Sequence, residues 1–257
     1  MSAFQVMLLP GIVLPAELAY GGLVTALGQD VETIVKDLDV YREDAPPPDY
    51  SLDTEVAGIL READVRGWSR FHLVGYSGGG AAALAFATRQ PARLLSLALL
   101  EPAWAGNWDW TPEHRRLWAN YEELEQLPHE QLMPAFMRLQ VRPEVQLSTP
   151  PPGPPPSWMG QRPAGIRALM RTFKSYSLDR DALAAFERPV YFALGGLSNP
   201  DQFAELAERL RKVFPDFTLE VFAERHHFDP PHRIEPERLA GSLRAIWARG
   251  SQTAPPE

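Results

Sequence analysis

The residues of this chain best suited to chemistry form a glycine-rich run around one serine. The run from Gly75 to Gly80, GYSGGG, follows the apolar stretch 71–74 and precedes three consecutive alanines. This order predicts a strand, a sharp turn and a helix, with Ser77 at the apex of the turn. Glycines around the serine allow close backbone approaches where a Cβ atom would clash. A serine held in this way projects its hydroxyl from the carboxyl end of the strand, where it can act as a nucleophile.

A glycine-rich turn between a strand and a helix can instead bind a phosphate group. The P-loop pattern ends in Gly-Lys followed by Ser or Thr, and no lysine lies near Ser77. The dinucleotide pattern places G-x-G-x-x-G at the first strand–helix turn of the fold. Here the spacing differs and the turn lies well into the chain. The sequence therefore favours a nucleophilic serine over either phosphate-binding loop.

Composition narrows the classes of partner and site. The chain has 257 residues, 45% of them hydrophobic, which suits one large α/β domain or a core with an insertion. The formal charge of −8 and the lack of a basic run argue against nucleic acid and membrane surfaces as partners. With no cysteine, disulfides, thiolate metal ligands and a cysteine nucleophile are excluded. We therefore expect a small-molecule substrate.

The apolar N-terminal segment 4–20 needs its own interpretation, because export signals are also apolar. No Lys or Arg precedes it, the first basic residue being Lys36, and proline, glycine and glutamate residues interrupt it. It is expected to form a strand, a loop and the start of a helix rather than a signal peptide, and a cytoplasmic location is predicted. No stretch of the sequence is long and apolar enough to span a bilayer.

Strands and helices are expected to alternate on both sides of the serine turn. Apolar runs predict strands at 4–9, 31–39, 70–75, 94–100, 190–194 and 217–222. Amphipathic or small-residue stretches predict helices at 16–27, 51–67, 78–90, 201–213 and 235–249. This alternation is typical of an α/β fold with three αβα layers and a mostly parallel sheet of about six strands. The tail 251–257 is expected to be disordered.

The segment 102–187 interrupts the alternation and shows no clear strand. Three helices are expected in it, beginning after Thr111 and covering 129–140 and 163–177. The proline-rich stretch 150–156 between the last two is expected to be extended and stiff. The segment therefore predicts a helical insertion into the α/β core.

Five of the seven tryptophans of the chain fall within this insertion. Some of them must hold the small helical unit together. Trp104, Trp108 and Trp110 follow closely after the strand end at 100, so they are predicted to line an apolar substrate pocket over Ser77.

Together, the serine turn, the alternating strands and helices, and the helical insertion resemble the α/β-hydrolase superfamily over nearly the whole chain. The resemblance implies an α/β-hydrolase fold with a minimal core, formed by residues 1–101 and 188–250. Residues 102–187 would form a helical cap or lid. It further implies that Ser77 is the nucleophile of a Ser-His-acid triad, and that neither a cofactor nor a metal is required.

The resemblance also implies two backbone N–H donors for an oxyanion. One belongs to the residue after the nucleophile, here Gly78. The other follows the first core strand, where the family usually has His-Gly-x and this chain has Pro10, Gly11 and Ile12. Ile12 is therefore the expected second donor, with Val13 as the alternative. The absent histidine matters little, because backbone groups make the donation.

The family places its catalytic histidine on the loop after the last strand, and this chain has three histidines there. Residues 225–232 have the sequence RHHFDPPH. The family's order of histidine, proline and helix favours His227, with His226 and His232 as alternatives. Neighbouring side chains at a strand end point in different directions, so only one of the adjacent pair can face Ser77. A metal site on this loop has little support, because the spacing matches no ligand motif.

The acid departs from the usual family pattern. The family places Asp or Glu after the strand expected at 190–194, where this chain has Asn199. An asparagine could orient the histidine but could not stabilise its charged form. Glu101 ends the strand after the elbow strand, a position that some family members use, and it is the preferred acid. Asp201 is the alternative, although it could instead cap the following helix.

These residues and the resemblance predict a serine hydrolase that cleaves an ester-like bond of a small or medium apolar substrate through an acyl-enzyme. A carboxylesterase is the leading expectation. The departure at Asn199 leaves open a ligand-binding or receptor-like homologue with little turnover. A partner-binding module that uses residues 150–156 is a third hypothesis.

Overall fold

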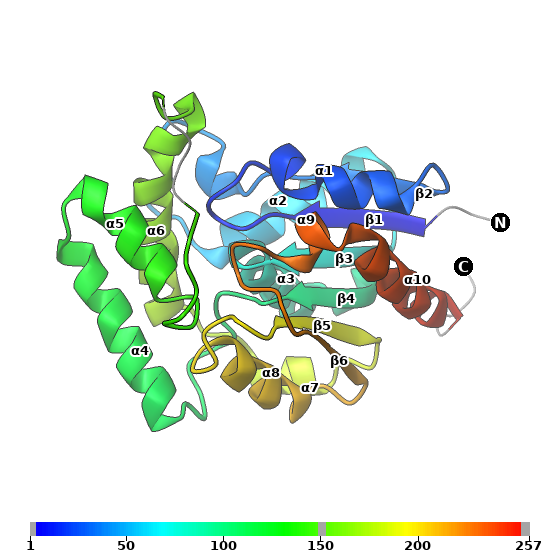
Figure 1. The fold of residues 1–257 in the computed structure, drawn as a ribbon. Helices are drawn as coiled ribbons and strands as arrows, with labels where there is room; N and C mark the ends of the chain where they lie inside the picture. Colours follow the sequence, from blue (N-terminus) through cyan, green and yellow to red (C-terminus); the bar gives the residue numbers. More distant parts are fainter. Residues whose placement is uncertain (1–3, 149–152, 253–257) are drawn as a thin grey trace.

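A six-stranded parallel sheet forms the centre of the protein in the computed structural model, which describes residues 4–148 and 153–252. The strand order is β2-β1-β3-β4-β5-β6, and each neighbouring pair is parallel (Figure 1). The strands are β1 (Phe4–Leu9), β2 (Val31–Val35), β3 (Phe71–Tyr76), β4 (Leu94–Leu100), β5 (Val190–Gly195) and β6 (Phe217–Phe222). The predicted fold class is confirmed, and each strand lies where an apolar run predicted it.

Helices cover both faces of the sheet and enclose two buried apolar clusters. One face is covered by α1 (Ala16–Leu27), α9 (Pro231–Ile234) and α10 (Pro236–Gln252), which contact one another. The other face is covered by α2 (Leu52–Val65), α3 (Gly78–Arg89), α7 (Arg180–Ala184) and α8 (Phe203–Arg211). Nearly continuous apolar strands are what a parallel sheet buried on both faces requires.

Three further helices stand together beyond the carboxyl ends of the strands, at the left of Figure 1. They are α4 (Pro112–Glu123), α5 (His129–Arg138) and α6 (Arg162–Ser175). We call these three helices the cap. The unpredicted helix α7 packs on α3 instead, so the last part of the interval 102–187 lies against the core. Residues 149–152 of the proline-rich stretch lie outside the described residues.

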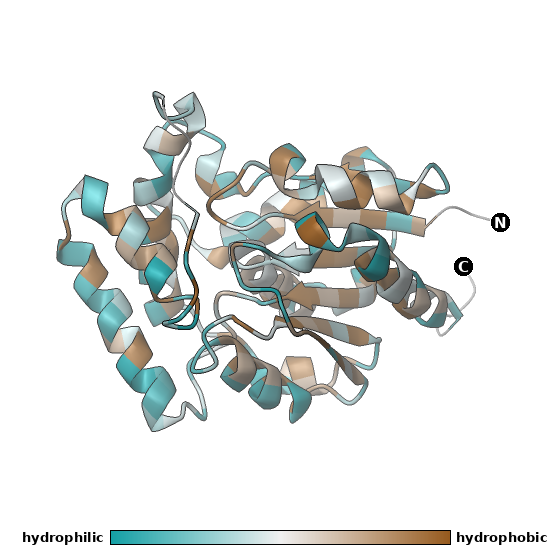
Figure 2. Cartoon of the chain, viewed as in Figure 1, coloured by the Kyte–Doolittle hydropathy of each residue, from teal (hydrophilic) through white to brown (hydrophobic). Residues whose placement is uncertain are grey.

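Hydropathy follows these layers. In Figure 2 the strands are largely hydrophobic, whereas α4 is mostly hydrophilic. The apolar side of α4 includes Leu117, Trp118 and Tyr121, which are buried. Within the described residues, no helix combines the length and the apolar character needed to cross a membrane.

The two largest differences between predicted and observed boundaries lie at the second strand and in the C-terminal tail. The second strand ends at Val35 rather than at residue 39, because Asp39–Tyr41 forms a 3-10 turn. The buried carboxylate of Glu55 accepts hydrogen bonds from two successive backbone N–H groups of this turn, at 2.8 and 3.0 Å. Residues 251–252, expected to be disordered, continue α10, so that part of the tail prediction is wrong; residues 253–257 lie outside the described residues.

The glycines of the serine turn are required by close backbone contacts. A Cβ atom on Gly75 would lie 2.4 Å from the carbonyl oxygen of Gly79. A Cβ atom on Gly79 would lie 2.5 Å from the carbonyl oxygens of both Leu9 and Pro10. Ser77, between the two glycines, has a φ of 53°, in the left-handed region that non-glycine residues rarely adopt. The turn is therefore held by β1 and by its own helix.

We expect Gly79→Ala to lower the free energy of unfolding by about 3 kcal/mol or more, because rigid backbone oxygens block the new methyl group. The matched control is Gly241→Ala in α10, where the new methyl group would meet no atom within 4 Å apart from the nearby backbone of its own helix. That change should raise stability by about 0.5–1 kcal/mol. Urea denaturation of both variants measures the two effects, and equal stabilities would contradict this account of the turn.

Candidate active site

Three side chains from separate loops meet at the carboxyl edge of the sheet. Ser77 Oγ lies 3.0 Å from Nε2 of His227, and Nδ1 of His227 lies 3.0 Å from Oε2 of Glu101. They are nearly inaccessible to solvent, with exposed fractions of 4%, 1% and 3% for the serine, histidine and glutamate. With its proton on Nδ1, the ring donates a hydrogen bond to the carboxylate, and Nε2 is left free to accept the hydroxyl proton of the serine.

Strand pairing brings the serine and the glutamate together. Tyr76 at the end of β3 is in register with Leu100 at the end of β4. Ser77 and Glu101 are the next residues of these strands, and the N–H of Ser77 donates to the carbonyl of Leu100 at 3.1 Å. Glu101 also has a positive φ, 46°. Its Oε1 accepts the N–H of Gly195 at 2.7 Å, which fixes the carboxylate from the side opposite the histidine.

His227 lies on the loop after β6 and is fixed through its ring and its backbone. The hydroxyl of Tyr76 donates to the carbonyl of His227. The ring of Phe203, at the start of α8, stacks on the imidazole with a centroid separation of 4.4 Å and an interplanar angle of 15°. The histidine is thereby oriented without help from a carboxylate on the β5–α8 loop.

The two alternative histidines face other partners. Nδ1 of His226 accepts the N–H of Phe228 at 3.2 Å. His232 is buried against the rings of Tyr20 and Tyr76, and neither of its ring nitrogens has a hydrogen-bond partner among the described residues. Burial lowers the pKa of His232 to about 3, so the ring is neutral.

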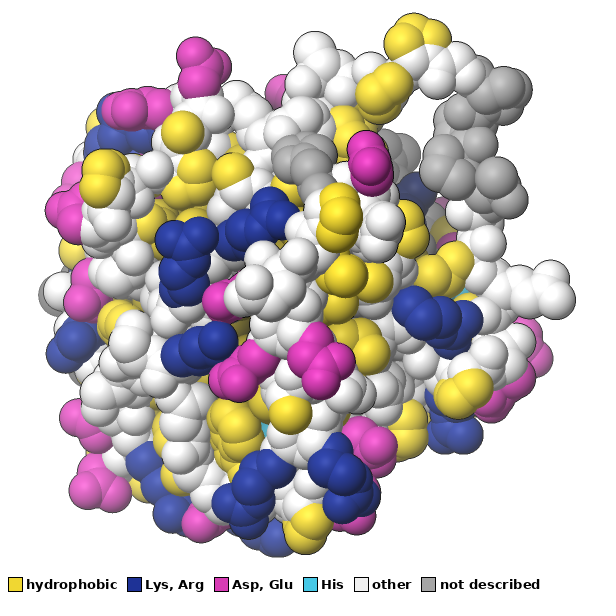
Figure 3. Space-filling view, turned by 90° about the vertical axis from the view of Figure 1, so that its left-hand side faces the viewer, with side chains coloured by type: hydrophobic (Ala, Val, Ile, Leu, Met, Phe, Trp, Pro, Cys, Tyr) yellow, Lys and Arg dark blue, Asp and Glu magenta, His cyan; other side chains and the backbone are white. Residues whose placement is uncertain are grey.

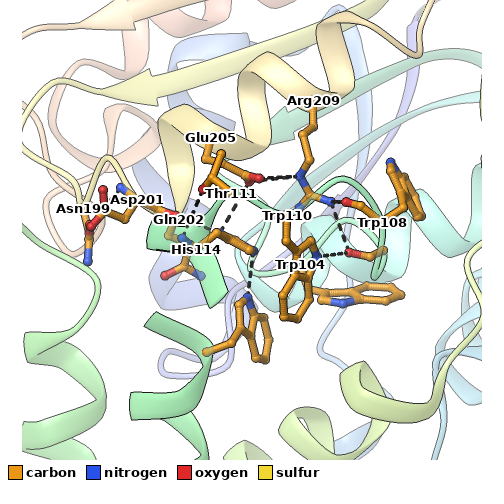
Figure 4. Close-up of polar contacts among 12 residues, drawn as sticks. Trp104, Trp108, Trp110, Thr111, His114, Asn199, Asp201, Gln202, Glu205 and Arg209 are labelled. Carbon is orange, nitrogen blue, oxygen red and sulfur yellow. Dashed lines mark hydrogen bonds and ion pairs between the residues drawn. The ribbon is translucent and has the colours of Figure 1, made fainter. Parts of the chain in front are cut away.

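The alternative acid and the asparagine at its usual position both have structural contacts. The carbonyl of Asp201 accepts the Nδ1–H of His114 at 2.7 Å, while the Asp201 residue is exposed (Figure 4). The Nδ2 group of Asn199 donates to the carbonyl of Leu139 at 2.7 Å. Of these candidates, Glu101 is the one that the structure places against His227.

The two expected oxyanion donors lie beside the serine. Ile12 and Gly78 line the same hollow as Ser77. Within the described part of the chain, neither N–H group donates a hydrogen bond. The carbonyl of Ile12 accepts the hydroxyl of Tyr41 at 2.9 Å, which holds this loop in place. Both N–H groups are thus available to a ligand oxygen.

An apolar hollow opens over Ser77 beneath the cap. Its walls come mainly from α4, α5 and α6, with two glutamines as polar exceptions. The lining residues are Ile12, Ser77, Gly78, Ala103, Trp118, Tyr121, Phe136, Gln140, Ile166, Leu169, Met170, Phe173 and Gln202.

Trp104, Trp108 and Trp110 do not line this hollow, so their predicted pocket role is wrong. The Nε1–H of Trp104 donates to Oδ1 of Asn107 at 2.7 Å, and the Nε1–H of Trp110 donates to the carbonyl of residue 106 at 3.0 Å. The indole of Trp110 stacks on Trp118, which does line the hollow. Trp110 and Trp104 therefore lie behind the pocket wall, where Trp104 stacks on Phe173. Trp118 and Tyr121 lie about one helical turn apart on α4, and this spacing was the sequence signal that could have identified them as lining residues.

Polar contacts join the cap to α8 behind this wall, where Nδ1 of His114 in α4 lies 3.4 Å from a carboxylate oxygen of Glu205 in α8 (Figure 4). Nε2 of His114 accepts the Nε1–H of Trp118 at 2.8 Å. Arg209 donates from Nε to Glu205 at 2.9 Å and from Nη1 to the carbonyl of Trp108 at 2.7 Å. Burial lowers the pKa of His114 to about 4 and raises the pKa of Glu205 above its usual range. These contacts position α4 and therefore the wall of the hollow.

A second hollow meets the first at the serine. The two hollows share Ile12, Ser77, Phe136 and Gln140. The second also includes His227 and extends toward α9. Ser77 therefore lies where two separate spaces join, which suits a bond with a group on either side.

Comparison with known proteins identifies the family. A family model described as "Alpha/beta hydrolase family" matches residues 6–241. This chain belongs to the alpha/beta hydrolase family. Comparison with curated protein sequences finds no significant match.

Solved structures with similar folds agree with this membership. A hydrolase from Pseudomonas aeruginosa has 17% identity and a TM-score of 0.69, with 95% of this chain and 89% of that chain covered. Carboxylesterase CesB from Bacillus subtilis has 18% identity and a TM-score of 0.64, with 95% and 83% covered. MenH from S. aureus has 15% identity and a TM-score of 0.70, with 98% and 95% covered. At these identities the likeness shows the fold alone.

Charge on the outer side of the cap is mixed. Figure 3, which faces the cap, shows Lys and Arg side chains interspersed with Asp and Glu side chains and with apolar ones. The coloured part of this face thus has no extended region of one sign. Among the described residues, no group of three or more His, Asp or Glu side chains is placed to hold a metal ion.

The buried ring of His232 should make stability depend on pH. Between its folded pKa of about 3 and the ordinary 6.5, the unfolded chain binds a proton that the folded chain does not. Stability is therefore lost as the pH falls below 6.5, by about 2 kcal/mol at pH 5 for this group alone. His232→Phe keeps the contacts with Tyr20 and Tyr76, so its loss between pH 7 and 5 should be about 2 kcal/mol smaller. Urea denaturation at pH 7 and at pH 5 measures these losses of stability. Equal losses in the wild-type protein and in His232→Phe would refute the neutral, buried state of His232.

Proposed function

We propose that this protein is a serine hydrolase of the carboxylesterase type, acting on an ester-like bond of a small or medium apolar substrate. The observation that supports it is the continuous chain of contacts from Ser77 through His227 to Glu101, with 3.0 Å at each step. Two unused N–H groups beside the serine complete what acyl transfer requires. The esterases among the solved structures are consistent with this proposal.

In the first step, His227 takes the hydroxyl proton as Ser77 Oγ attacks the carbonyl carbon. The N–H groups of Ile12 and Gly78 stabilise the oxyanion. The tetrahedral intermediate collapses, and His227 gives its proton to the departing alkoxide, which leaves as the alcohol. A water molecule, deprotonated by the same histidine, then releases the acid from the acyl-enzyme. Glu101 maintains the tautomer and stabilises the imidazolium in both steps.

The two hollows define the substrate in this proposal. The apolar hollow beneath the cap would take one side of the ester, either the acyl or the alcohol group, and the second hollow would take the other side. Aromatic and aliphatic walls favour an apolar group of limited length. No cofactor or metal is needed for these steps.

Ser77→Ala should abolish hydrolysis of an activated ester such as p-nitrophenyl butyrate while leaving the unfolding midpoint nearly unchanged, because the change removes one hydroxyl. The first experiment is labelling with a fluorophosphonate, which reports an activated serine without knowledge of the substrate. Stoichiometric labelling mapped to Ser77, and lost in His227→Ala, is the expected result. Folded protein that neither reacts with the label nor turns over the ester would instead favour the receptor-like alternative.

Glu101→Gln should lower kcat by about 10³- to 10⁴-fold, because an amide cannot stabilise the imidazolium and favours the wrong tautomer. Asp201→Asn is the matched control, since it makes the same chemical change at an exposed residue that contacts the site only through its backbone. Steady-state kinetics of the two variants provide the comparison. The reverse ranking would assign the acid to Asp201.

A further inference from the structure

One buried amide lies at the junction of the two hollows. Gln140 lines both hollows, as Ser77 does, and the residue is only 1% exposed. Its Nε2 group donates to the carbonyl of Phe136 at 3.1 Å, one turn earlier in the chain. Within the described residues, no group donates to its Oε1. The free end of this side chain is therefore a hydrogen-bond acceptor in otherwise apolar surroundings.

The backbone around Gln140 is tied to the core. The N–H of Asn199 donates to the carbonyl of Gln140 at 3.0 Å, and the side chain of Asn199 donates to the carbonyl of Leu139 at 2.7 Å. Val141 forms an antiparallel bridge with Ser198. Asn199, at the usual acid position of the family, thus anchors residues 139–141, the cap segment that follows α5 and includes Gln140.

The lack of a donor from the described residues gives this acceptor a consequence for binding when a ligand covers it. An amide oxygen left unpaired in an apolar site costs free energy, and a ligand that supplies a donor removes that cost. A site of this kind discriminates more strongly against ligands that lack the donor than an apolar wall can discriminate by shape. A scissile carbonyl attacked by Ser77 must lie at the junction of the hollows, so the donor must be close to it.

We propose that Gln140 is a specificity-determining residue whose Oε1 accepts a hydrogen bond from a hydroxyl or amide N–H next to the scissile bond. The preferred substrates are then esters that are apolar at their ends and have one donor beside the carbonyl. This inference rests on the proposed esterase function. Gln140 acts in substrate binding, and the proton transfers remain with His227.

The experiment compares matched esters with the wild-type protein and with Gln140→Met, which keeps the length of the side chain but removes the amide. One pair is methyl hexanoate and each enantiomer of its α-hydroxy derivative. The other pair is propyl hexanoate and 2-hydroxyethyl hexanoate, the monoester of ethylene glycol, which places the donor on the alcohol side. In wild type, we expect kcat/KM to favour the donor ester of at least one pair by about tenfold. In Gln140→Met this ratio should fall to the ratio of the intrinsic reactivities of the two esters.

Control variants separate this role from others. Gln131→Met makes the same change at an exposed position of α5 and should leave both esters unaffected. An equal loss on donor and donor-free esters in Gln140→Met would mean that the amide orients the attacking water or only shapes the wall, and would overturn the proposal. So would an absence of donor preference in wild type that still hydrolyses the esters in a Ser77-dependent way. No turnover and no labelling of Ser77 would instead overturn the esterase function, and this inference with it.

Discussion

The contact between the serine turn and the loop after β1 constrains the rest of the site. Gly79 packs directly on the carbonyls that end β1, and its own N–H donates to the carbonyl of Pro10 at 3.0 Å. Because β1 and β3 are adjacent in the sheet, this contact sets the distance between Ile12 and Gly78. The backbone strain at Ser77 is tolerated because packing on both sides leaves the turn no other conformation.

The position of the acid follows from the geometry of a parallel sheet. Residues that immediately follow adjacent parallel strands lie at the same edge, so either the β4 or the β5 end can bring a carboxylate to a histidine from the β6 loop. This chain has its carboxylate at Glu101, after β4. The loop after β5 is thereby free for another task, and Asn199 in that loop bonds to the cap segment.

The cap combines apolar walls toward the serine with polar contacts behind them. The neutral ring of His114 is buried and lies 3.4 Å from Glu205, which pairs with Arg209, so these groups connect α4 to α8. Such buried polar contacts favour one arrangement of helices, because a shift of α4 would separate the Nδ1–H of His114 from its acceptor, the carbonyl of Asp201. The shape of the apolar hollow depends on this arrangement.

The sequence by itself determined the order and type of nearly every element, since apolar periodicity, caps and glycine spacing are local properties of the chain. The candidate serine, histidine and glutamate were also chosen from the sequence, the last two with the help of a family resemblance. The residues that line the pocket were not identified from the sequence. Trp104, Trp108 and Trp110 are close to the site in the chain, but their N–H groups bind within their own turn, and α4 brings Trp118 to the wall instead. The sequence also did not predict the pairing of Gln140 with the loop of Asn199, about sixty residues later. Only the tertiary structure decided these points, because they depend on how the cap packs on the core.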